Sequence, residues 1–177
     1  MKLLLLISLS IISLNNKIKT QPPGTIYLDS NIYIDTEYIS VQSWKEYVMI
    51  KEYNNEIAFY PDTTYTINGL NYYNSGYYNS KPILKISFEA VQDYIKWRMG
   101  YINNSLKNFS MKNKCKPNFY VENYKKNIKV IYRLAKKEEY IKALKKGLLL
   151  KIDLNESFSE EEWTNASSFR CVAFLDD

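Results

Sequence analysis

The segment 87–103, SFEAVQDYIKWRMGYIN, carries the clearest periodic signal in the chain. Its large apolar residues recur at steps of three, four, four and three, so an α-helix would place them on one face. Ser87 stands just before the run, where a serine side chain can cap the first helical turn. The sequence therefore predicts an amphipathic helix whose apolar face the rest of the domain must cover. That face consists of Phe88, Val91, Ile95, Met99 and Ile102.

Two further helices are predicted on either side of it. The first spans 40–53, with Ser40 as N-cap; its inward face comprises Val41, Trp44, Val48 and Lys51. The second spans 136–147 and stops at Gly147; its inward residues are Tyr140, Ile141 and Leu144.

Strands are predicted where apolar and polar residues alternate. Segment 22–36 reads as two strands around an Asp29-Ser30-Asn31 turn, and 128–134 and the closing run 169–174 read as single strands. A short strand is also expected at 83–86. This order of elements is not a βαβ array and indicates an α+β domain of low regular content.

The first 20 residues are expected to be a signal peptide, which leaves 21–177 as the domain. A basic Lys2 precedes twelve largely apolar residues, a length typical of a signal and too short to span a bilayer. We therefore expect a secreted, periplasmic or outer-envelope protein without a transmembrane segment. Removing three lysines and no acid lowers the formal net charge from +5 to +2, so the high pI is no argument for nucleic-acid binding.

The composition excludes some chemistry and leaves other chemistry open. The chain has no histidine, which rules out a Ser-His-Asp triad, a Cys-His pair and a histidine metal site. Its 17 tyrosines fit a turn-rich domain with aromatic rings in the core. The tyrosine-rich loop 65–78 is alternatively a surface that binds sugars or proteins.

Four stretches resemble, in order, the motifs of the formylglycine-generating enzyme family, also called the sulfatase-modifying-factor domain. They are PPGTIYLDSNIYIDTEYISVQSWKEYV (22–48), KPILKISFEAVQDYIKWR (81–98), YRLAKKEEY (132–140) and FRCVAF (169–174). The family has a variant of the C-type-lectin fold, so the resemblance implies that fold here, with a shortened C-terminal half. The chain looks most like the secreted bacterial branch, which includes lipoproteins of gliding motility.

The residues that carry this resemblance are expected to define the fold and not to perform catalysis. They are Gly24, Asp35, Glu37, Ser87, Tyr94, Trp97, Arg133, Leu134, Glu139, Phe169 and Arg170. Asp35 and Glu37 are alternatively a carboxylate pair for acid–base chemistry, although no nucleophile accompanies them. Arg133 and Arg170 either bind an anion or fork onto a carboxylate or a backbone carbonyl.

Active members of the family bind copper through two cysteines that lie before the closing strand. Residues 141–168 contain no cysteine, and the soft thiolate ligands that copper needs are therefore missing. We assign no catalytic, cofactor-binding or metal-ligating residue, and expect copper or calcium only if the family activity is retained.

The two cysteines, Cys115 and Cys171, are a candidate disulfide in an exported chain. In many family members the cysteine of the closing strand pairs with a position occupied here by Ile95. Cys115 can replace that partner, and such a bridge would stabilise the fold by about 4 kcal/mol. The alternative is a free, buried Cys171.

The functional hypothesis is a pseudoenzyme, a non-catalytic binding or structural module at the cell envelope with a protein or glycan partner. Two alternatives remain open: oxidation of a sulfatase cysteine to formylglycine with displaced thiols, and lectin-like carbohydrate binding.

Overall fold

The computed structural model describes residues 21–108, 128–150, 155–164 and 166–176. The predicted signal peptide and Cys115 lie outside the described residues. Helices and antiparallel sheets occur together, which confirms the α+β class. Among the described residues, no helix has both the length and the apolar character needed to cross a membrane.

A four-stranded antiparallel sheet holds the domain together, in the order β1-β2-β6-β5. Its strands are β1 (Thr25–Asp29), β2 (Ile32–Asp35), β5 (Lys129–Leu134) and β6 (Cys171–Asp176). The closing strand therefore lies in the middle of the sheet, where Ile34 of β2 pairs with Val172 of β6. The predicted strands 22–36, 128–134 and 169–174 are confirmed, within three residues at their ends.

The β1–β2 hairpin turns at the predicted polar cluster. Ser30 and Asn31 both have positive φ angles, 43° and 62°, which suits the tight turns that join twisted antiparallel strands. Asparagine tolerates this left-handed backbone better than most residues. Just before the hairpin, Gly24 has a φ of 77° and its carbonyl accepts the Thr36 N–H, which ties the two ends of the hairpin together.

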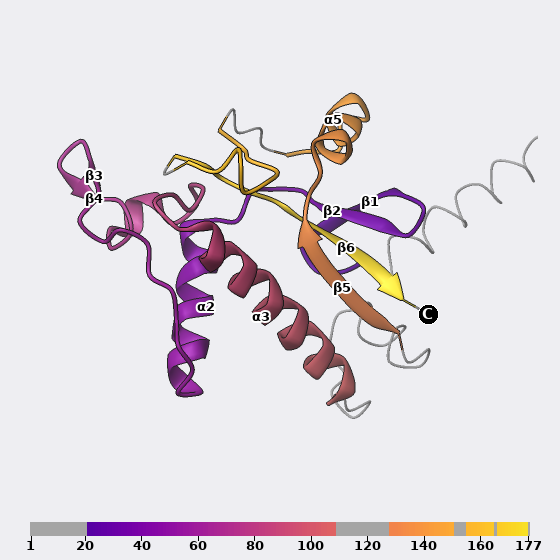
Figure 1. Cartoon of the computed structure of the whole chain (residues 1–177), viewed down its shortest axis with the longest axis horizontal. Helices are drawn as coiled ribbons and strands as arrows, with labels where there is room; N and C mark the ends of the chain where they lie inside the picture. The colour runs from indigo at the N-terminus through magenta and orange to yellow at the C-terminus, as the bar shows by residue number, and fades with distance from the viewer. Residues whose placement is uncertain (1–20, 109–127, 151–154, 165, 177) are drawn as a thin grey trace, which may run out of the picture.

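Of the two capped helices, α3 (Phe88–Lys107) packs on one face of the sheet, and α2 (Val41–Tyr53) packs against α3 away from the strands (Figure 1). The predicted N-caps are confirmed: the Ser40 side chain accepts the Ser43 N–H, and the Ser87 side chain accepts the Ala90 N–H. All four residues predicted on the inward face of α2 are buried.

Stacked aromatic rings form the centre of this larger core. Trp44 of α2 stacks on Tyr94 of α3 with ring centres 5.2 Å apart, and Phe169 meets both rings edge-on. Cys171 and Ala173 of β6 belong to the same core, whereas Val172 faces the other way. Such an alternation is what the geometry of a β-strand produces.

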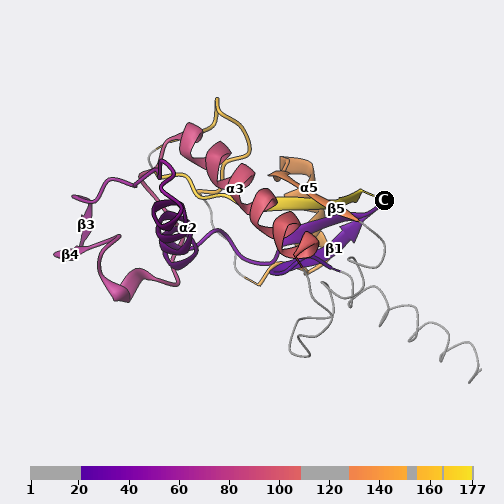
Figure 2. The same ribbon diagram turned by 90° about the horizontal axis from the view of Figure 1, so that it is seen from below.

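Helix α5 (Lys137–Lys145) covers the opposite face of the sheet, as the views in Figures 1 and 2 show. It contacts β1 and β2 and buries Ala143 against Leu28, Ile34 and Val172. The prediction that Ile141 points inward is wrong, because its side chain is 42% exposed. The helix instead turns Ala143 toward the sheet, and this small side chain lets the helix approach the sheet closely. Gly147, with a φ of 63°, ends the helix as predicted.

The tyrosine-rich segment is an ordered loop outside the sheet. It contains a small hairpin, β3 (Thr66–Ile67) with β4 (Leu70–Asn71), and a short 3₁₀ helix, η1 (Gly76–Tyr78). Tyr72, Tyr73 and Tyr78 are buried, and the Tyr72 and Tyr78 hydroxyls donate to the backbone carbonyls of Pro82 and Ile67. Most of its rings therefore act as core.

The predicted strand at 83–86 is wrong. Ile83 and Ile86 are buried as an apolar run requires, but Lys85 between them has a φ of 60°. A residue in the left-handed backbone conformation interrupts an extended strand. The segment is therefore irregular, although both isoleucine side chains still reach the core.

Candidate functional site

The hairpin, α2 and α3 enclose an open cleft of about 530 Å³, here called the helix cleft. Its walls are the residues just before β1, the end of β2 with its connection to α2, the first two turns of α2 and one face of α3. The lining residues are Pro23, Gly24, Asp35, Thr36, Glu37, Tyr38, Ile39, Ser40, Ser43, Glu46, Tyr94, Trp97, Arg98, Tyr101 and Ile102. Five of them, Gly24, Asp35, Glu37, Tyr94 and Trp97, were singled out from the sequence.

A buried ion pair closes the floor of the helix cleft. Both guanidinium nitrogens Nη1 and Nη2 of Arg98 donate to the Asp35 carboxylate, each at 2.8 Å, and Nη2 also donates to the Pro23 carbonyl. Burial opposes the charged guanidinium, but the charge of Asp35 outweighs it and raises the pKa of Arg98 well above its ordinary value. Fork-to-fork geometry of this kind fixes both partners.

Asp35 also joins the floor to the closing strand, since its Oδ2 accepts the backbone N–H of Cys171 at 2.8 Å. The Cys171 thiol is free and fully buried. Burial, together with the nearby Asp35 charge, raises the pKa of this thiol to about 12. Cys171 is therefore a protonated structural residue at neutral pH, because the thiolate is the reactive form.

Aromatic rings form the wall above this floor. Trp97 and Tyr101 are one turn apart on α3 and stack with ring centres 5.5 Å apart at an interplanar angle of 24°. Tyr101 is the outer ring and is 48% exposed. Trp97 also meets Tyr47 edge-on and Tyr94 at a tilt of 45°, so the exposed end of this stack is anchored in the core. Tyr38 lines the cleft from the β2–α2 connection.

The charged groups that line the cleft are unbalanced. Asp35, Glu37 and Glu46 supply three carboxylates, and Arg98 is the one base among the described residues that line it. Asp35 is buried, whereas Glu37 is half-buried and Glu46 is exposed. Arg170 lies near the Tyr38 ring at 5.9 Å, but its Nε donates to Glu156 at 3.0 Å, and this pair is itself buried.

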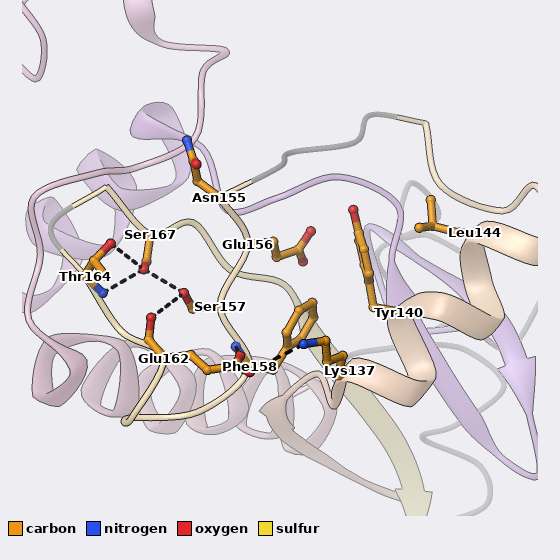
Figure 3. Close-up of a pocket in the computed structure, with 10 residues that line it drawn as sticks. All are labelled: Lys137, Tyr140, Leu144, Asn155, Glu156, Ser157, Phe158, Glu162, Thr164 and Ser167. Carbon is orange, nitrogen blue, oxygen red and sulfur yellow. Dashed lines mark hydrogen bonds and ion pairs between the residues drawn. The ribbon is translucent and has the colours of Figure 1, made fainter.

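A second cleft, of about 510 Å³, lies between α5 and the segment 155–167 (Figure 3). Its polar groups largely bind one another. The Ser157 and Ser167 hydroxyls are 2.6 Å apart, the Thr164 N–H donates to Ser167, and Lys137 pairs with Glu162 at 3.7 Å. We assign these contacts to holding the segment in place, and take the helix cleft as the candidate site.

The remaining motif residues are structural. Arg133 forks onto Glu139 and also donates to the carbonyl of Leu134, while the Glu139 carboxylate accepts the Lys136 N–H at the start of α5. Arg170 binds Glu156 and the Asp35 carbonyl. Of the two roles considered from the sequence, both arginines therefore have the structural one, in which the guanidinium binds a carboxylate or a backbone carbonyl.

Sequence reasoning missed four residues that the site description uses: Arg98, Tyr101, Tyr38 and Glu46. Arg98 and Tyr101 follow Tyr94 at the helical steps +4 and +7, so they share its face of α3. That spacing was a usable signal. Glu46 gave none, because an exposed glutamate on a helix is an ordinary surface residue.

No group of three His, Cys, Asp or Glu side chains suited to hold a metal occurs within the described ranges. Comparison with models of known protein families, with curated proteins and with solved structures finds no match to this chain.

Proposed function

We propose that this chain is a non-catalytic binding module of the cell envelope and that the helix cleft is its ligand site. The proposal includes a divergent relationship to the sulfatase-modifying-factor domain, carried by the sequence motifs and compatible with the α+β architecture. The predicted signal peptide supports export to the periplasm, the outer envelope or the medium.

One observation carries the proposal: a rigid, closed floor lies beneath an open aromatic wall. Asp35 and Arg98 neutralise each other's charge at the floor, and Trp97 and Tyr101 line the cleft above this pair. A concave site with preorganised aromatic rings and a few polar groups is typical of ligand recognition. A reaction site would also require a nucleophile or a poised acid.

The state of Cys171 argues against the oxidoreductase alternative. Copper-dependent oxidation of a cysteine needs thiolate ligands that a substrate can reach, and Cys171 is enclosed with a pKa raised to about 12. The alternative in which loop 65–78 binds carbohydrate is also weakened. Tyr72, Tyr73 and Tyr78 are buried, so a sugar ring cannot stack on them.

The test is to titrate isotope-labelled protein with peptides and neutral oligosaccharides and to map the backbone amide shifts. We expect ligand-dependent shifts to concentrate at residues 35–46 and 94–102. Shifts confined to other surfaces, or none with any probe, would overturn the helix cleft as the site. Turnover of a Cys-x-Pro-x-Arg peptide by the purified protein with copper would overturn the non-catalytic assignment.

A further inference from the structure

We draw no further inference here: the strongest candidate, the partly exposed row of apolar side chains that Ile32, Phe174 and Ile131 form across β2, β6 and β5 on the α5 side of the sheet, carries nothing because no contact in the part of the chain that the structure describes shows what covers it.

Discussion

Arg98 holds Asp35 with two hydrogen bonds of 2.8 Å across 63 positions of sequence, and this pair joins α3 to the central sheet. Asp35 Oδ2 simultaneously accepts the Cys171 N–H, so one carboxylate connects the hairpin, the helix and the closing strand. The same pair forms the floor of the helix cleft. The residues that connect these elements therefore also belong to the proposed ligand site.

Replacing either partner of the Asp35–Arg98 ion pair should destabilise the fold. We expect Arg98→Met or Asp35→Asn to lower the free energy of unfolding by roughly 3–5 kcal/mol, since each leaves a buried charge uncompensated. Urea denaturation measures this, with Lys96→Met on the exposed side of α3 as control. The Asp35→Asn/Arg98→Met double variant should lose less than the two single losses added together. Additive losses would mean that the two groups do not interact.

The edge of the sheet offers a second test. Asn103 of α3 donates to the Val130 carbonyl and accepts the Val130 N–H, both at 2.8 Å, and thereby pairs with the outer side of β5. Asn103→Ala should cost about 1–3 kcal/mol because both backbone groups lose their partner. Hydrogen exchange at the Val130 amide should quicken, while Asn104→Ala on the neighbouring exposed position should leave it unchanged. An unchanged exchange rate in Asn103→Ala would contradict the pairing.

Cys171 should resist alkylation in the folded protein at pH 8 and react once the protein is denatured without reductant. Burial and the raised pKa of about 12 both keep the thiol protonated and enclosed. Mass spectrometry of the peptide that contains Cys171 gives the readout. Labelling only after reduction would instead show the candidate disulfide between Cys171 and Cys115.

The Glu139 carboxylate should make the free energy of unfolding depend on pH. Burial alone would raise its pKa, but hydrogen bonds from Arg133 and from the Lys136 N–H, with the charge of Arg133, hold it below the ordinary value of 4.5. The unfolded chain therefore takes up the proton first as the pH falls, and the stabilisation is complete above 4.5 and lost below it. Urea denaturation from pH 7 to 3 should show the gap between the parent and Glu139→Gln narrowing with acid. A gap that does not change with pH would argue against the ion pair.

The helices followed from the sequence because their signals are local. Ser40 and Ser87 cap the helices within one turn, and the apolar steps of α2 mark buried residues. On α3 the predicted Val91, Ile95 and Ile102 are buried, while Phe88 and Met99 are half-buried. Ile141 was misplaced because α5 is short and exposed, and the line it buries depends on how closely the small Ala143 approaches the sheet. That distance is a property of the packing and not of the periodicity.

The site was only half predictable for a related reason. Asp35 and Trp97 were recognised as motif residues, but Arg98 looked like any basic residue on a helix. Its role depends on a partner 63 positions away, and a single sequence does not record which distant charges meet. Asp35 was expected to define the fold, with a carboxylate pair with Glu37 as the alternative, and its contacts with Arg98 and Cys171 show how it anchors the structure.

The position of β6 between β2 and β5 also bears on how the protein is made. The hairpin and α3 emerge from the ribosome long before residues 171–176, so the central strand of the sheet is the last to arrive. Until then β2 and β5 have no strand between them, and the complete sheet on which α3 packs has not formed. A chain that cannot complete its sheet early would stay unfolded for longer, and an unfolded chain is what the proposed export through a narrow channel would require.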